Sequence, residues 1–516
     1  MFEFRSPSDQ EPRRLCLVRR QIPVVLSTVR RVALADGRPT VPGFTESAST
    51  RVSPEAVSPR AWRALFLTSL ATVLVGFNST ATNIALDDIQ AGFSGASAAD
   101  VGWGVAGFFI GTAAFMPLAG RLADRIGRKR MFQLGLLLFA LSAVFSAVAP
   151  TVLMLNLSRV LQAIAGAALL PSSLALVLPL FPESRRSTAV GLWSAAGPLG
   201  AGVAPAAAAL ILAAAGWRAV YLVSAPVALL MFWGGWKMLR ELPIPPNQQR
   251  LDLVGAAGGT VAVAAVVTAI MQGRVWGYSS PITITVAVIG VAALGLFVAN
   301  SSRHPEPLLN LHLLRRRGVF VANTVNFLGS ITSQPLWIVW PLFMKNVWNF
   351  STLQVGLGVT LGPVTAGCST LVFSRLADRI GAIGLCRLGT MFQMAAVSWH
   401  LTQLGSEVNF WSDFAPGILM YGLGWGMSIP LLNGVALEWV EEKFFAETNG
   451  LYGTLRYASG AIGTAMVFAL LTTTRGIEAL PYYERILAVF LVATTLSAMA
   501  MWIPVGKAPP RNSWAR

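Results

Sequence analysis

The sequence predicts an all-α integral membrane protein with fourteen transmembrane helices, built as two six-helix halves and an inserted central pair. The chain is 54% hydrophobic and only 12% charged, which is too little charge to cover a soluble protein of 516 residues. Its apolar blocks are about twenty residues long, enough to cross about 30 Å of hydrocarbon as helices. In addition, the seven residues Arg121 to Gly127 recur unchanged at Arg375 to Gly381, 254 positions later (378 minus 124). Such a repeat predicts two related halves.

The expected spans follow the apolar blocks, and each is 17 to 25 residues long, as a spanning helix requires. They are 62–86, 101–119, 131–149, 151–171, 188–212, 217–239, 253–271, 281–300, 319–341, 353–373, 388–404, 414–436, 450–472 and 482–504. The repeated loop pairs the second span with the tenth. The similar starts Gly191-Leu192-Trp193 and Gly450-Leu451-Tyr452 pair the fifth with the thirteenth. Both offsets are eight spans, which makes the seventh and eighth the inserted pair.

The same evidence gives five segments. A basic, disordered cytoplasmic tail is expected over 1–60, which holds ten arginines and six acids without a long apolar run. The N-terminal half then covers 61–250, the inserted pair 251–304 and the C-terminal half 305–505. A second cytoplasmic tail covers 506–516.

Loop charges predict the orientation. The first loop contains Asp87, Asp88 and Asp100 and no basic residue, whereas the second carries Arg121, Arg125, Arg128, Lys129 and Arg130. Lys and Arg accumulate on the cytoplasmic side, so both termini are expected there, in a multi-pass protein of a bacterial inner membrane. The net charge of +16 lies between hydrophobic blocks and does not indicate nucleic-acid binding.

The first copy of the repeated loop, Gly120 to Arg130, resembles the loop signature of the major facilitator superfamily. Glycines permit a tight turn, and an acid can meet a helix N-terminus or an arginine. The resemblance implies a latch between the halves; a plain cytoplasmic loop is the alternative. The latch residues are Gly120, Asp124, Arg125, Gly127, Arg128, Asp378 and Arg379.

Further motifs resemble the fourteen-helix drug:proton antiporter (multidrug efflux) branch of that superfamily. Arg159-Val160-Leu161-Gln162 matches its arginine motif, with a purely structural arginine as the alternative. The fifth span matches the branch's helix-packing motif, in which small residues and prolines let two helices approach. Its residues here are Gly191, Trp193, Gly197, Pro198, Gly200 and Pro205.

The first span departs from the branch pattern. Asn78 stands where the branch usually has Asp, and asparagine cannot carry a proton. Asp87 is the leading substitute; a solvated interfacial charge is the other interpretation. The candidates for transport and proton coupling are Arg159, Asp87, Asn78, Asn83, Gln162 and Arg456.

The predicted function is secondary active transport: alternating-access efflux of small amphipathic, drug-like compounds, coupled to protons. The alternatives are export of a neutral or anionic lipid or metabolite without the usual coupling, and a non-transporting membrane sensor. We expect no enzyme, no metal and no cofactor beyond the ion gradient, since neither a catalytic set, nor metal-ligand spacing, nor a nucleotide-binding loop occurs. The expected partners are a small-molecule substrate and the lipid bilayer, with the protein a monomer.

Overall fold

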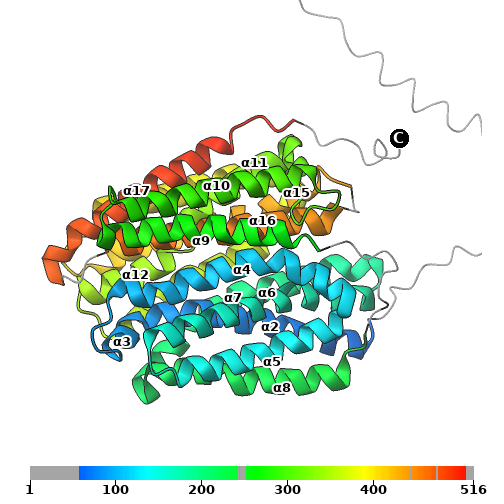
Figure 1. Ribbon diagram of the computed structural model, residues 1–516, viewed down its shortest axis with the longest axis horizontal. Helices are drawn as coiled ribbons and strands as arrows, with labels where there is room; N and C mark the ends of the chain where they lie inside the picture. Colours follow the sequence, from blue (N-terminus) through cyan, green and yellow to red (C-terminus); the bar gives the residue numbers. More distant parts are fainter. Residues whose placement is uncertain (1–56, 242, 244–250, 442–443, 472–474, 507–516) are drawn as a thin grey trace, which may run out of the picture. The chain divides into compact units, whose positions relative to one another are not determined.

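The computed structural model describes residues 57–241, 243, 251–441, 444–471 and 475–506 (Figure 1). The tails predicted at the two ends of the chain fall almost wholly outside the described residues. Residues 57–506 belong to one compact unit, and its regular elements are helices.

The helices follow one another along the chain with short connections. They are α2 (Pro59–Ile84), α3 (Leu86–Ala91), α4 (Ala98–Ile126), α5 (Arg128–Ala147), α6 (Val152–Val177), α7 (Glu183–Leu222), α8 (Ser224–Met238), α9 (Leu253–Trp276), α10 (Pro281–Arg303), α11 (Arg317–Ser333), α12 (Leu336–Asn346), α13 (Thr352–Ile380), α14 (Ala382–Gln403), α15 (Ala415–Leu437), α16 (Phe445–Leu470) and α17 (Leu480–Ala500). A π-helical turn over Phe410–Phe414 leads into α15.

Ten helical segments among the described residues are long and apolar enough to cross a membrane. They coincide with ten of the expected spans. The other four expected spans are also helical, as α8, α11 with α12, α14 and α16, but these helices are shorter or less apolar. The multi-pass, all-helical class is therefore confirmed, whereas the count of fourteen spans stays a prediction.

One expected span is divided in the structure, and one expected break lies inside a single element. The single span expected over 319–341 is two helices, because Pro335 has no amide hydrogen to continue the ladder of α11. The expected break before residue 217 is present inside α7: Gly216 has φ of 74° and ψ of 176°, which are not helical, so α7 is two helices joined across a kink.

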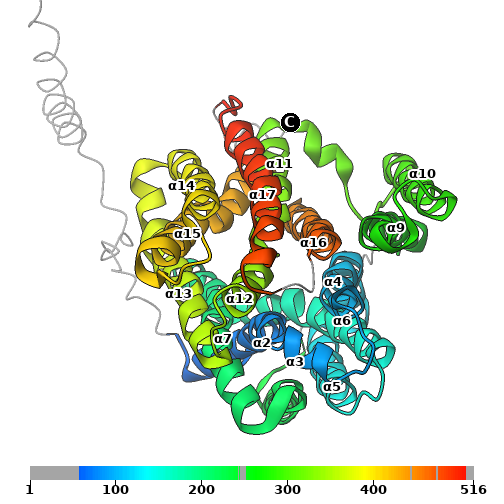
Figure 2. The ribbon, with the colours of Figure 1, turned by 90° about the vertical axis from the view of Figure 1, so that its left-hand side faces the viewer.

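The helix packing repeats between the two halves of the chain. In the first half α4 packs on α6, α5 on α6 and on α8, and α2 on α7. In the second half α13 packs on α15, α14 on α15 and on α17, and α11 on α16. The halves meet along two seams, α4 with α16 and α7 with α13, and α9 and α10 lie beside the α4–α16 seam (Figure 2).

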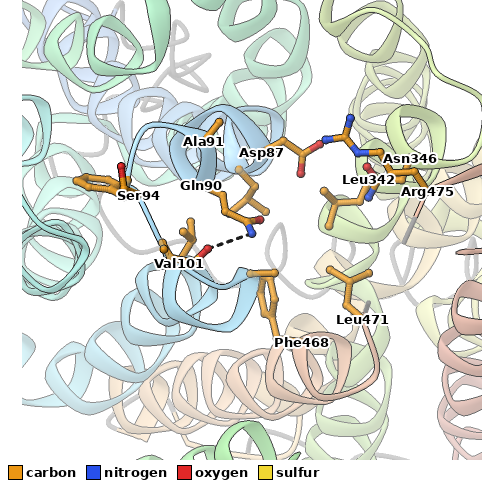
Figure 3. Close-up of a pocket in the computed structure, with 15 residues that line it drawn as sticks. Asp87, Gln90, Ala91, Ser94, Val101, Leu342, Asn346, Phe468, Leu471 and Arg475 are labelled. Carbon is orange, nitrogen blue, oxygen red and sulfur yellow. Dashed lines mark hydrogen bonds between the residues drawn. The ribbon is translucent and has the colours of Figure 1, made fainter. Parts of the chain in front are cut away.

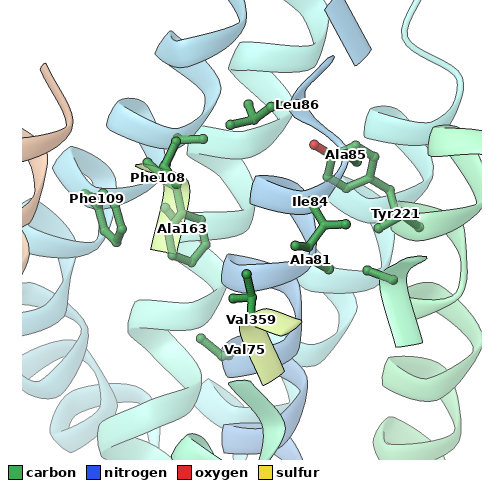
Figure 4. Packing of buried hydrophobic residues seen from close by; sticks show 14 of the residues in the cluster. Val75, Ala81, Ile84, Ala85, Leu86, Phe108, Phe109, Ala163, Tyr221 and Val359 are labelled. Carbon is green, nitrogen blue, oxygen red and sulfur yellow. The ribbon is translucent and has the colours of Figure 1, made fainter. Parts of the chain in front are cut away.

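Close helix contacts depend on small residues. Buried alanines lie between large side chains such as Phe108, Phe109 and Tyr221 (Figure 4). A methyl group on Gly200 of α7 would lie 2.5 Å from the Val73 carbonyl oxygen of α2, which is closer than van der Waals contact allows. At the other seam, a methyl group on Gly356 of α13 would lie 2.6 Å from the Pro205 carbonyl oxygen. The α7 helix therefore fits closely between α2 and α13.

Candidate transport site

Arg159 is the centre of a buried polar cluster in the first half. It lies on α6 with only 1% of its surface exposed. Its guanidinium donates hydrogen bonds to the side-chain oxygens of Asn78 on α2 and Gln162 on α6. The rings of Phe108 and Tyr221 lie 4.8 and 5.6 Å from the guanidinium carbon, within range of cation–π attraction. The predicted candidates Arg159, Asn78 and Gln162 thus meet in one place.

The partners of Arg159 are neutral. Asn78 stands where the drug:proton antiporter branch usually has Asp. Its side-chain amide donates a hydrogen bond to the hydroxyl of Ser224 at 3.2 Å. The Nε of Arg159 and the Nε2 of Gln162 are buried and have no hydrogen-bond partner among the described residues. The cluster therefore holds a positive charge with amide groups and aromatic faces rather than with an anion.

Arg456 is the corresponding cation in the second half. It lies on α16, is partly buried, and its guanidinium carbon is 5.6 Å from the ring centre of Trp425 on α15. Its Nε is buried without a hydrogen-bond partner in the described part of the chain. The next residue, Tyr457, faces Phe109 of α4 across the seam, with ring centres 6.3 Å apart. Arg456 is thus near the contact between the halves.

A pocket of about 410 Å³ lies between the halves at the end that carries α3, which is the outer end by the orientation predicted from loop charges (Figure 3). Asp87 and Gln90 of α3 line it on one side, and Asn346 and Arg475 on the other. Apolar side chains, including those of Leu342 and Phe468, complete the wall. In Figure 3, Asp87 and Arg475 point toward one another.

An ion-pair group joins the halves beside this pocket. Lys345, at the end of α12, lies 2.8 Å from the carboxylate of Asp88 and 3.7 Å from that of Asp87. Burial raises the pKa of Asp87, an effect that Lys345 and Arg475 oppose. Asn83, another predicted candidate, is buried one helical turn away and borders a small space that Asp87 and Lys345 share. Asp87 therefore lies at the outer contact between the halves, away from Arg159.

The repeated loop forms the tight turn that its glycines predict. Gly127 has φ of 103°, and Gly381, in the second copy, has 89°. Asp124 pairs with Arg128 within the loop, at 3.0 Å. Arg125 and Arg379 occupy the last turns of their helices, Gly120 has open space around it, and the side chain of Asp378 is outside the described residues. The assigned latch role stays a prediction.

Other residues connect this loop to its surroundings. Glu241, after α8, accepts hydrogen bonds from the backbone amides of Lys129 and Arg130, at 2.8 and 3.1 Å. Arg121 donates to the backbone carbonyls of Glu306 and Pro307, beyond α10. The loop is thereby tied both to its own half and to the segment that follows the inserted pair.

Asp252 organises that segment. It caps α9 by accepting from the Gly255 amide at 2.7 Å, and it also accepts from the Leu308 amide and the Asn300 side chain. Burial acts to raise the pKa of Asp252, but these hydrogen bonds hold it below the ordinary value. Asn310 then donates to Glu447 of α16 at 2.9 Å. The segment after α10 thus contacts both halves.

The residues of the predicted packing motif all lie on α7, and they differ in their surroundings. Gly200 and Pro205 are at the close contacts described above, and Trp193 donates to Ser173 of α6 at 3.0 Å. Gly191 and Gly197 have open space where a Cβ would lie, and Pro198 is inside the helix. Trp340, on α12, is buried and donates to His400 at 3.2 Å.

Sequence reasoning did not single out Lys345 or Arg475. Lys345 is one of only five lysines and ends an apolar segment, which is a usable signal. Its partner Asp88, however, is 257 positions away and belongs to the other half. Only the folded arrangement identifies the group.

Comparison with known proteins agrees with the fold. A family model described as Major Facilitator Superfamily matches residues 68–253. Multidrug resistance protein Stp of Mycobacterium tuberculosis is 26% identical over 427 residues, covering 82% of this chain and 78% of that protein. Puromycin resistance protein pur8 of Streptomyces alboniger is 29% identical, covering 79% and 81%. A crystal structure of a D-xylose-proton symporter has a TM-score of 0.65 at 15% identity, covering 86% and 98%.

The family match, the relatives and the fold agree on the class of protein. The protein is a transporter rather than an enzyme. The chain is thus similar to the major facilitator superfamily over residues 68–253, and over most of its length it is similar to proteins named for drug resistance.

Proposed function

We propose that this chain exports small amphipathic, drug-like compounds across a bacterial inner membrane by alternating access, coupled to protons, as a monomer with both termini in the cytoplasm. The observation that carries the proposal is the contact between the halves at the outer end. Lys345 is held by Asp87 and Asp88 through ion pairs that water can replace when the halves separate. Relatives named for resistance to several drugs or to puromycin support the class of cargo.

Proton coupling needs a group that can gain and lose a proton. Asp87 is the candidate, because burial raises the pKa of this carboxyl and it borders the pocket between the halves. Because its pKa is raised where it is buried between the halves, a proton on Asp87 would favour the closed outer end, and loss of that proton would favour separation.

A second candidate function is export of a neutral or anionic lipid or metabolite without the usual proton coupling. The observation that favours it is the neutral amide of Asn78 beside Arg159. A non-transporting sensor is the remaining alternative.

The test is flux in vesicles. The full chain is reconstituted in lipid vesicles, and the movement of ethidium, a cationic dye, is followed under an imposed pH gradient. Ethidium movement that follows the gradient and is lost in Asp87→Asn supports the proposal. Movement of a neutral or anionic compound without a pH gradient supports the second candidate. Absence of flux with every compound would leave the sensor.

A further inference from the structure

The charges at mid-depth in the bundle are of one sign. In every described α-helix, Asp and Glu occur only within the first or last five positions. Among the cations of these helices, Arg159 and Arg456 alone lie more than six positions from either helix end. At 1.5 Å per residue, Arg159 is about 10 Å from the start of α6 and Arg456 about 17 Å from the start of α16. Both are deep in the bundle, and no carboxylate of the described helices is at that depth.

A purely structural arginine at this depth is expected to be neutralised. A lone arginine at mid-bilayer is energetically costly. Charged residues in membrane proteins therefore pair with opposite charges or face a water-filled path. Here Arg159 donates hydrogen bonds to two amide oxygens and contacts the faces of two aromatic rings. Arg456 contacts the face of the Trp425 ring. Each keeps a buried Nε without a hydrogen-bond partner among the described residues.

The two arginines belong to different halves and flank the same seam. Phe108, which stacks on Arg159, is adjacent to Phe109, and Phe109 faces Tyr457, the neighbour of Arg456. A ligand held between the halves at this seam would therefore meet a cation from each side. The counter-charge that is missing from the protein would come from the ligand.

Resting on the function proposed above, we infer that the cargo carries an anionic group, a carboxylate, sulfonate or phosphate, which Arg159 and Arg456 bind between the halves. The rest of the cargo is flat and apolar, since Phe108, Tyr221 and Trp425 surround the guanidinium groups. A monovalent anion leaving a cell with a negative interior gains about 2.3 kcal/mol per 100 mV, which corresponds to roughly a 50-fold gradient. The membrane potential therefore adds to the force that drives export of such a cargo.

The experiment uses three probes that share a dansyl ring and differ in charge. One carries a sulfonate, one a neutral amide and one a trimethylammonium group. The full chain is reconstituted in vesicles with equal, strongly buffered pH on both sides, and a potassium gradient with valinomycin sets the potential. We expect the sulfonate probe to accumulate on the positive side, and to do so at least tenfold more slowly in Arg159→Gln and in Arg456→Gln.

Arg303→Gln is the matched control, because it removes an exposed arginine from the last turn of α10. We expect it to leave sulfonate flux unchanged. Thermal unfolding in detergent checks folding: the sulfonate probe should raise the unfolding temperature of the wild type and of Arg303→Gln, and not that of the other two variants.

The outcomes separate this inference from the proposed function. Transport of the trimethylammonium probe without the sulfonate probe would overturn the anionic cargo and leave an exporter. Sulfonate flux that is unaffected by the membrane potential would also overturn it. If none of the three probes moves under either gradient, the export function itself fails.

Discussion

Replacing Lys345 with methionine is expected to open the outer end of the protein. Methionine keeps most of the apolar stem of lysine and removes the ammonium group that Asp87 and Asp88 share. If those ion pairs form only when the two halves meet at the outer end, their loss destabilises that arrangement and no other. The equilibrium then shifts toward the form in which the pocket is open to the outside.

The size of the shift follows from the exposure of the pair. Exposed ion pairs contribute about 0.2–1 kcal/mol, whereas breaking a buried one costs about 3–5 kcal/mol. The side chain of Lys345 is 23% exposed and that of Asp88 40%, so this pair is intermediate. We take a loss of about 1–2 kcal/mol, which changes the ratio of closed to open forms by a factor of about 5–30.

The assay is the reaction of a cysteine in the pocket wall with a membrane-impermeant maleimide. Leu342 lines the pocket and is only 4% exposed, so Leu342→Cys should react chiefly when the outer end opens. The three natural cysteines, Cys16, Cys368 and Cys386, are first replaced by alanine. We expect Lys345→Met to raise the labelling rate by a factor of about 5–30. An unchanged rate would refute the gating role of the ion pair.

The matched control is Arg485→Met. Arg485 is an exposed cation near the same end of the bundle, within 5.6 Å of the ring centre of Tyr482. Since it is exposed, its removal should leave the labelling rate as it is. An equal increase in both variants would indicate a general effect of surface charge.

Three further predictions concern stability, each measured by thermal unfolding in detergent. Gly200→Ala should lower the stability of the fold by about 1–3 kcal/mol, because the added methyl group forces α7 away from α2. Gly191→Ala, where a methyl group has open space, should be neutral or stabilising by up to about 1 kcal/mol. Equal effects of the two substitutions would contradict the close contact at Gly200. Asp252→Ala should cost about 2–4 kcal/mol by losing a cap and leaving backbone amides without an acceptor. Because the folded protein lowers the pKa of Asp252, this stabilisation is present above the ordinary carboxyl pKa and is lost as the pH falls through the folded value, so wild type and variant should converge in acid. The folded protein raises the pKa of Asp87, so burying the ionised carboxylate costs folding free energy above the raised pKa, and this cost is lost as the pH falls to the ordinary carboxyl pKa. Asp87→Asn should therefore stabilise the protein at neutral pH and have no effect in acid. A loss of stability at neutral pH would show that attraction to Lys345 outweighs burial.

Much of the fold could be predicted because membrane spans are a local property of the sequence. Apolar blocks of sufficient length fix where helices occur, and the repeated loop gives the relation between the halves. The break at Pro335 was visible in the sequence but not decisive, since prolines also occur inside helices here, for example Pro171 in α6 and Pro363 in α13. Whether a proline ends a helix depends on whether other groups can donate hydrogen bonds to the backbone carbonyls that lose their helical partners. That depends on the tertiary structure.

The candidate site could be predicted only in part. The need of Arg159 for a partner follows from the cost of a charge in a bilayer, and the sequence supplied Asn78 and Gln162 as residues of interest. That all three meet depends on how α2 packs on α6. The pairing of Lys345 with Asp88 depends on contact between halves, and no local pattern carries that information.

The depth of a charged residue in the helix bundle determines its role: Lys345 lies at the outer end, and Arg159 lies deep in the bundle. At the outer end, water replaces the ion pairs of Lys345 at little cost when the halves move apart, so charges there suit the control of conformation. Arg159 has no such replacement in the closed protein, because amides and rings surround it and only 1% of it is exposed. A change in its charge balance must therefore come from a bound ligand. For this reason we expect Lys345→Met to alter labelling of the pocket while probe selectivity is kept, and Arg159→Gln to alter selectivity while labelling is kept. If each variant changed both properties, conformational control and cargo recognition would not be separable in this protein.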